Sequence, residues 1–280
     1  MEWKGRRGSN NIEDRRSSSV GRTAGIGGIG AVVVLLIGLF LGVDVTPLLQ
    51  DPGAGTGSPA VLTAEDQAAG EFVSVTLADT EDVWTTIFRD QLNAKYTPAT
   101  LVLFKNVTPS PCGNASGATG PFYCPNDKKV YLDTAFFATL EQRLGAKGDF
   151  AAAYVVAHEI GHHVQDEMGI LGKTTEVRQR VSESDANEIS VRVELQADCF
   201  AGIWARQTSE QFGTIQPGDF EEALNAARQI GDDTLQRNAG QRPMPHTFTH
   251  GTSEQRQSWF ARGLKSGQIA DCDTFSTDSL

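Results

Sequence analysis

Basic residues are scarce in this sequence, which has 24 lysines and arginines against 35 aspartates and glutamates and a net charge of −11. A chain of this charge repels nucleic acid, so we expect no nucleic-acid partner. The few basic residues are unevenly placed, because residues 1–22 carry a net charge of +3 and the remainder carries −14. Internal repeats are absent. The length of 280 residues suits one sizeable domain with extensions.

Charged residues are missing altogether from residues 23–43, TAGIGGIGAVVVLLIGLFLGV. An apolar run of this length can span a bilayer as a helix. The basic arm before it would stay cytoplasmic by the positive-inside rule. A cleaved signal peptide is the alternative, but the arm is long and no Ala-x-Ala-like site follows the run. We therefore predict a single transmembrane anchor here.

This prediction divides the chain into four parts: a basic cytoplasmic arm (1–22), a transmembrane anchor (23–43), a flexible stalk (44–62) and an exported domain (63–280). The stalk is rich in proline and glycine, as linkers are. Gly38 and Gly42 form a GxxxG pair, a pattern found where membrane helices dimerise. In so glycine-rich a segment chance explains the pair better, so a homodimer through the anchor is the weaker interpretation.

Only four cysteines are present. An even number in an exported domain predicts two disulfides. Cys112 and Cys124 bracket a glycine-rich loop that a disulfide would close, which leaves Cys199 and Cys272 as the second pair. Four cysteines allow three pairings, and buried free thiols are an alternative because Cys199 lies in an apolar, helical stretch.

The hydrophobic pattern from residue 63 onward predicts a mainly helical α+β domain with a short β-sheet. Strands are expected at 99–104 and 129–133. Helical periodicity starts at Thr63, with Thr80 as the N-cap of a second segment. Further helices are expected between Gly148 and Gly169, at 176–207, at 217–233 and from Ser253.

Histidine is also rare, yet three of the five histidines lie in YVVAHEIGHHVQ, residues 154–165. A spacing of four puts His158 and His162 on one face of a helix, where two imidazoles can bind one zinc ion. Glu159 is rotated by about 100° from that face, so it can reach water at the metal without being a ligand. This is the H-E-x-x-H motif, in which the glutamate is the general base. His163 does not fit the ligand face, and we interpret it as a packing or hydrogen-bonding residue.

A catalytic zinc ion needs a third protein ligand and an open fourth position. Gln165 and Met168 stand where a metzincin would have glycine and histidine, which excludes that class. The remaining histidines, His246 and His250, are candidates for the third ligand. A glutamate on a later helix is the other option.

The segment ELQAD supplies such a glutamate, Glu194. Its neighbours in the sequence are apolar, which is not the setting of a solvated helix face, so we favour Glu194 as the third ligand. Asp198 lies one turn further along the same face. It could hold a ligand imidazole by its other nitrogen.

Five segments together resemble the bacterial YpfJ-type neutral zinc metallopeptidase family: WKGRRGSNNIEDRR, VYLDTAFF, AYVVAHEIGHHVQ, RVELQADCFAGIWA and FTHGTSEQRQSWF. The resemblance runs from the first residues to about Gly263 and is interrupted by the stalk. It implies a zincin-like peptidase domain anchored in the bacterial cell membrane, with the domain periplasmic or extracellular.

The order of these motifs also resembles a gluzincin-type site, which combines H-E-x-x-H with a glutamate ligand, a nearby aspartate, and a C-terminal histidine and arginine. The matching positions are His158, Glu159, His162, Glu194, Asp198, His250 and Arg256. The resemblance implies that His250 stabilises the oxyanion of the reaction, with His246 as its rival. Arg256 would support the same charge or fix the loop. Gly251 stands where such sites usually have proline, which weakens these last two assignments.

The sequence therefore predicts a membrane-anchored peptidase with one zinc ion, acting on a peptide or protein substrate. A zinc-stabilised binding or scaffolding module without turnover is the alternative. A purely structural site would not need Glu159 beside an open coordination position, so we favour the enzyme. Hydrolysis of a non-peptide amide is a third option, but no sugar-binding groove is evident in the sequence.

Overall fold

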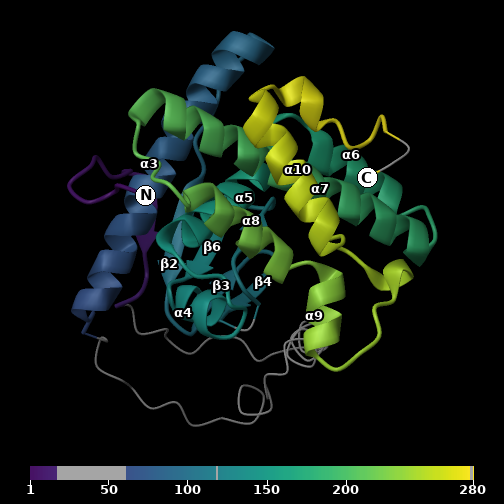
Figure 1. Cartoon of the computed structure of the whole chain (residues 1–280), viewed down its shortest axis with the longest axis horizontal. Helices are drawn as coiled ribbons and strands as arrows, with labels where there is room; N and C mark the ends of the chain where they lie inside the picture. The colour runs from purple at the N-terminus through teal and green to yellow at the C-terminus, as the bar shows by residue number, and fades with distance from the viewer. Residues whose placement is uncertain (18–60, 118, 278–279) are drawn as a thin grey trace.

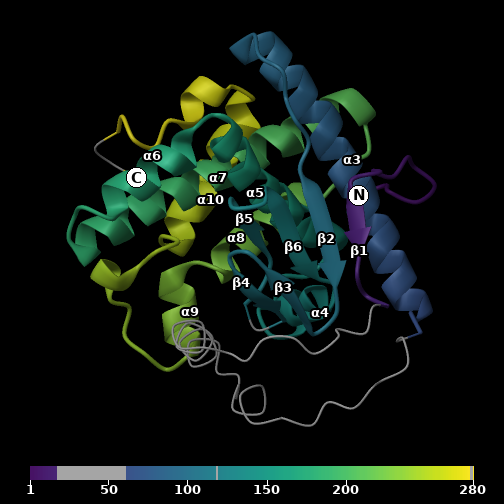
Figure 2. The ribbon, with the colours of Figure 1, turned by 180° about the vertical axis from the view of Figure 1, so that it is seen from behind.

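The computed structural model describes residues 1–17, 61–117, 119–277 and 280. Within these residues a four-stranded sheet is surrounded by helices (Figures 1 and 2), which confirms the mainly helical α+β architecture. The strand order across the sheet is β1 (Ile12–Asp14), β2 (Thr100–Phe104), β6 (Lys129–Asp133) and β5 (Phe122–Cys124). The first three strands are parallel, and β5 is an antiparallel edge strand. Strands β2 and β6 are buried beyond their first residues, as parallel strands covered by helices are.

A separate hairpin lies beside the sheet, formed by β3 (Val107–Ser110) and β4 (Gly113–Ser116). Cys112 lies in its turn and is bonded to Cys124 at the end of β5. This disulfide has the pairing expected from the sequence. It ties the hairpin to the edge strand.

The helices are, in chain order, α3 (Ala64–Leu92), α4 (Ala135–Gln142), α5 (Asp149–Glu167), α6 (Ile170–Arg178), α7 (Glu183–Phe212), α8 (Asp219–Gln229), α9 (Asp232–Asn238) and α10 (Ser253–Ser266), with short 3₁₀ helices η1 (Pro245–Thr247) and η2 (Ile269–Cys272).

The central helix is α5, which contacts α3, α7, α8 and the sheet. Fifteen of its 19 residues are buried, because it is apolar around most of its circumference. The H-E-x-x-H motif is therefore carried by the most enclosed helix of the domain.

Two local predictions about the helices need correction. Thr80 is not an N-cap: it is buried inside α3, where its hydroxyl donates to the carbonyl of Leu77 at 2.7 Å. The segment around it has no helix-breaking residue, so α3 runs on from its true cap at Thr63. The helix predicted at 176–207 is the end of α6 followed by α7, because Ser182 caps a new helix there.

Residues 1–17 are an integral part of this fold. Strand β1 pairs with β2, and the arm runs along α3 (Figure 2). Arg6 makes a two-pronged ion pair with Asp79 of α3, at 2.6 and 2.8 Å. Ser9 donates its backbone N–H to the carbonyl of Ser74, at 2.9 Å. Arg6, and likewise Arg7 through Asp82, therefore pair with acidic residues of α3.

The predicted transmembrane helix and the single-pass membrane location are wrong. None of the helices found in the described residues combines the length and the apolar character needed to cross a bilayer. The predicted anchor at 23–43, and the stalk except Val61 and Leu62, lie outside the described residues. A single crossing between the arm and the domain would also put them on opposite sides of a membrane, whereas β1 and β2 share one sheet. A cytoplasmic arm with an exported domain is therefore incompatible with this fold.

Candidate metal centre

Three side chains of the sequence-predicted site converge between α5 and α7. The Nε2 atom of His158 lies 3.1 Å from one carboxylate oxygen of Glu194, and the Nε2 atom of His162 lies 3.5 Å from the other. The two histidines share a face of α5 because they are one turn apart, and Glu194 faces them from α7. The three side chains are 7, 13 and 18% exposed, so the cluster can be reached from solvent.

The donor atoms of this cluster fit a zinc ion. Two imidazole nitrogens and a carboxylate are the protein ligands of one common type of catalytic zinc site. Zinc–ligand bonds of about 2.0–2.1 Å in a tetrahedron hold ligand atoms roughly 3.3 Å apart. The observed separations of 3.1 and 3.5 Å lie on either side of that value. Three ligands leave one tetrahedral position for water or substrate.

His158 is held from behind by a buried polar network. Its Nδ1–H donates to Asp198 at 2.9 Å, so its Nε2 atom is the one directed at the cluster. Arg256 of α10 donates two hydrogen bonds to the same carboxylate, at 2.8 and 3.0 Å. The hydroxyl of Tyr154 donates to it as well, at 2.5 Å. All four side chains are buried, and the network fixes both the tautomer and the direction of His158.

The charges around His158 also determine its protonation in the absence of metal. Burial by itself lowers the pKa of this imidazole. The charge of Asp198 and the hydrogen bonds that the ring donates to Asp198 and Glu194 outweigh burial and raise the pKa to about 10. Burial raises the pKa of Glu194, yet the nearby charges of His162 and His250 bring it well below its usual value. The site is therefore built to receive positive charge.

Glu159 lies close enough to the cluster to be affected by the charges of His162 and His158, and it is not one of the three grouped donor side chains. It is 7% exposed, and burial raises the pKa of its carboxyl above the usual value. No hydrogen bond to this carboxylate is found within the described residues. With no hydrogen bond from the described residues, this carboxylate could accept a proton from a water bound at a metal ion in the cluster.

His250 lies in the loop before α10, and its imidazole is half exposed. One carboxylate oxygen of Asp232 accepts three consecutive backbone N–H groups, from Thr249, His250 and Gly251, at 2.7–3.0 Å. The other oxygen lies 3.3 Å from Nδ1 of His250. This single carboxylate therefore holds both the loop and the ring. Burial lowers the pKa of His250, but the charge of Glu194 and the bond to Asp232 raise it overall.

Two other histidines lie outside the cluster. His163 is buried, and its Nε2–H donates to the carbonyl of Thr97 at 2.7 Å, which fits the packing role expected for it. His246 is exposed in η1 and is not among the clustered ligand atoms. The structure thus brings His250, rather than His246, into electrostatic contact with Glu194.

Sequence reasoning missed three residues of this site. Tyr154 could have been found, because it continues the four-residue spacing of His158 and His162 toward the start of α5. In the sequence, Gln165 served only to exclude the metzincins, which have glycine at this position. Its side-chain oxygen in fact accepts a hydrogen bond from Nδ1 of His162 at 2.9 Å. Asp232 gave no sequence signal beyond an acidic residue at a helix start.

Comparisons with known proteins agree with this donor set. The model of a family described as "Putative neutral zinc metallopeptidase" matches residues 1–275. The chain is 45% identical to the uncharacterized protein YpfJ of Escherichia coli strain K12, over 98% of this chain and 99% of that protein. It is 44% identical to uncharacterized proteins of Mycobacterium bovis and Mycobacterium tuberculosis, over 66% of this chain and 65% of theirs. No solved structure matches significantly. The chain belongs to the neutral zinc metallopeptidase family.

Proposed function

We propose that the protein hydrolyses peptide bonds in peptide or protein substrates, with Glu159 as general base and one zinc ion held by His158, His162 and Glu194. The proposal is carried by one observation: a carboxylate that accepts no hydrogen bond from the part of the chain that the structure describes lies beside three donor side chains that suit zinc. When bound, zinc supplies Lewis-acid chemistry for a water and a carbonyl.

The residues around the ligands have distinct tasks in this proposal. Glu159 takes a proton from the attacking water and passes it to the leaving nitrogen. Burial raises the pKa of its carboxyl, which makes Glu159 a stronger proton acceptor than an exposed glutamate. Asp198 and Arg256 hold His158 with its Nε2 atom toward the centre.

His250 is proposed to stabilise the negative charge that builds up on the substrate carbonyl oxygen. A hydrogen-bond donor directed at that oxygen is usually a major part of such catalysis. Asp232 fixes the loop and accepts from Nδ1, so Nε2 remains for the substrate. The raised pKa of His250 favours the protonated ring, which is the better donor.

The first prediction tests this function directly. Glu159→Gln should keep zinc bound and reduce cleavage of an unstructured protein such as casein by at least about 100-fold, because it removes the base and no ligand. Zinc content by elemental analysis and cleavage rate are measured on the same sample. Glu167→Gln is the matched control: it lies on the same helix, pairs with Lys128, and should cleave normally.

Near-normal cleavage by zinc-loaded Glu159→Gln would rule out this mechanism. Absence of cleavage by the wild-type protein, despite bound zinc, would favour a zinc-stabilised module without turnover.

A further inference from the structure

A chain of hydrogen bonds leads from His162 to the C-terminal disulfide. The first member is Gln165, which is completely buried on α5, three residues after His162. Its Oε1 atom accepts from Nδ1 of His162 at 2.9 Å. Its Nε2 atom donates to the backbone carbonyl of Val193 at 2.8 Å and to Oε1 of Gln196 at 3.0 Å. These hydrogen bonds connect α5 to α7, and Val193 directly precedes the proposed ligand Glu194 in the sequence.

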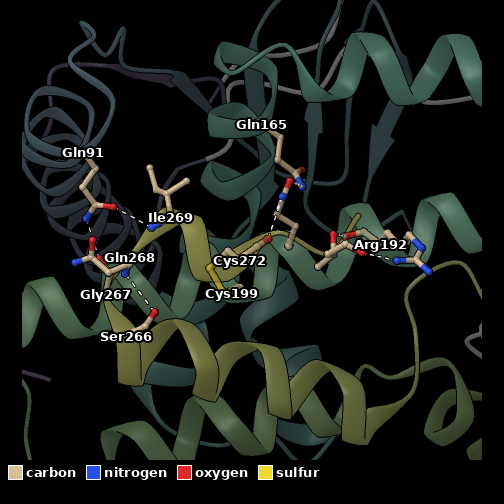
Figure 3. Close-up of a disulfide and its surroundings, with 11 residues drawn as sticks. Gln91, Gln165, Arg192, Cys199, Ser266, Gly267, Gln268, Ile269 and Cys272 are labelled. Carbon is tan, nitrogen blue, oxygen red and sulfur yellow. Dashed lines mark hydrogen bonds between the residues drawn. A yellow bond between two sulfur atoms is a disulfide. The ribbon is translucent and has the colours of Figure 1, made fainter. Parts of the chain in front are cut away.

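The second member is Gln196, which is 5% exposed. Its Nε2 atom donates to the backbone carbonyl of Cys272 at 3.0 Å. Figure 3 shows Gln165 directed toward the segment that carries Cys272, next to the Cys199–Cys272 disulfide. The far end of the chain is therefore attached covalently to α7.

The direction of every bond in this chain is determined by two backbone carbonyls. A carbonyl oxygen only accepts, so Cys272 requires the amide nitrogen of Gln196, and Val193 requires the amide nitrogen of Gln165. Each amide must then present its oxygen in the opposite direction. His162 consequently meets only an acceptor and must carry its proton on Nδ1, which leaves Nε2 for a metal ion.

The segment that carries Cys272 is itself held in place. Gln91 of α3 accepts from the backbone N–H of Ile269 and donates to the carbonyl of Gly267, both at 2.9 Å (Figure 3). Thr274 donates to the carbonyl of Arg192 at 2.8 Å. With the disulfide, these contacts give the carbonyl of Cys272 a fixed position relative to α7.

We propose that Gln165 and Gln196 are positioning residues for the zinc ligand His162, and that the Cys199–Cys272 disulfide anchors their hydrogen-bond chain. The inference rests on the zinc centre of the proposed function. His158 is held by the charged pair of Asp198 and Arg256, whereas His162 is held by neutral amides. Such outer partners typically change metal affinity by about 10–100-fold.

The experiment measures zinc affinity by competition with a chelator, without substrate. Gln165→Met should weaken zinc binding by roughly 10–100-fold, and Gln196→Met by about 10-fold. Gln236→Met is the matched control: this glutamine is also buried, with its amide bound to Met244 and Thr247, and zinc affinity should not change. Cobalt(II) absorption spectra add a second readout, because an altered ligand geometry shifts the bands while general destabilisation does not.

The disulfide is tested with two double variants. Removal of both sulfurs in Cys199→Ala/Cys272→Ala should weaken zinc binding by about 10-fold. The same change at Cys112 and Cys124, which tie the hairpin to β5, should leave zinc affinity as it is.

Unchanged zinc affinity and cobalt spectra in both glutamine variants would overturn the proposal. So would a loss of affinity in Gln236→Met as large as in the other two. If the Cys199/Cys272 variant fails to fold, the glutamine variants decide. Because no cleavage is measured, the outcome is separate from the Glu159 test of the proposed function.

Discussion

At the residue scale, the candidate centre is surrounded by more negative than positive charge. Glu159, Glu194 and Asp198 lie in or beside it, and Arg256 is already paired with Asp198. Without metal, protonated histidine balances part of this charge. A zinc ion would replace that proton, so metal binding and protonation compete at one place.

This competition leads to a prediction about pH. The pKa of His158 in the metal-free fold is raised to about 10, so the ring keeps its proton between pH 6.5 and 10. Zinc needs the neutral ring, so binding in this window should release the proton. Zinc affinity should rise by at least about tenfold per pH unit, because the pKa of His162 is raised as well. Calorimetry at pH 8 in two buffers of different ionisation enthalpy measures the released proton. A binding heat that does not depend on the buffer would contradict the prediction.

The role of His250 gives a further prediction at this scale. His250→Ala should lower kcat by about 10²–10³, because it removes one donor to the substrate oxygen. KM and zinc content should change little. Steady-state kinetics and elemental analysis check both points. Loss of zinc would instead identify His250 as a ligand, and Glu194 would then need another role.

At the scale of elements, α7 and α10 approach each other closely enough to join Asp198 to Arg256. Glycines make this approach possible. A Cβ atom on Gly202 would lie 2.0 Å from the backbone oxygen of Phe260, and one on Gly263 would lie 1.9 Å from that of Cys199. Backbone cannot move aside as a flexible side chain can, so the two helices can be this close only with glycine there.

We therefore predict that Gly202→Ala destabilises the fold by about 1–3 kcal/mol, although alanine is the better helix former. Gly172→Ala in α6 is the matched control, because among the described residues nothing besides its chain neighbours and the adjacent backbone of its own helix lies within 4 Å of the added Cβ. It should stabilise the protein by up to about 1 kcal/mol. Urea unfolding of the two variants measures the difference. Equal effects of the two substitutions would refute the close-packing argument.

At the scale of the whole molecule, residues 1–17 and the domain are one folding unit. The pair of Arg6 and Asp79 illustrates this, because Asp79 is 4% exposed at its side chain and needs a cation. Burial raises the pKa of Asp79 despite the nearby Arg6, so a charged Asp79 without Arg6 would destabilise the fold.

Arg6→Met should accordingly lower the free energy of unfolding of the entire protein by about 1–3 kcal/mol in a single transition. The double variant Arg6→Met/Asp79→Leu should recover part of the lost stability, since it leaves no charge buried without a partner. Chemical unfolding followed by fluorescence measures both. If the arm were not part of the unit, Arg6→Met would leave the transition of the domain unchanged.

Several features could be predicted from the sequence alone because they depend on short-range pattern. The spacing of His158 and His162 determines that they share a helix face. The glycines at 148 and 169 delimit that helix, and the apolar neighbours of Glu194 indicate that it faces inward. The short, mostly apolar runs at 99–104 and 129–133 predict the two central strands, β2 and β6.

Other features were decided only by the tertiary structure. The pairing of β1 with β2 joins residues almost 90 positions apart, and no local pattern encodes it. The apolar run at 23–43 suggested separate compartments for parts of the chain that in fact share a sheet. Asp232, Gln165 and Gln196 are ordinary polar residues in the sequence. They acquire their partners because helix packing brings a buried donor and acceptor together, and a buried polar group must be satisfied wherever the fold places it.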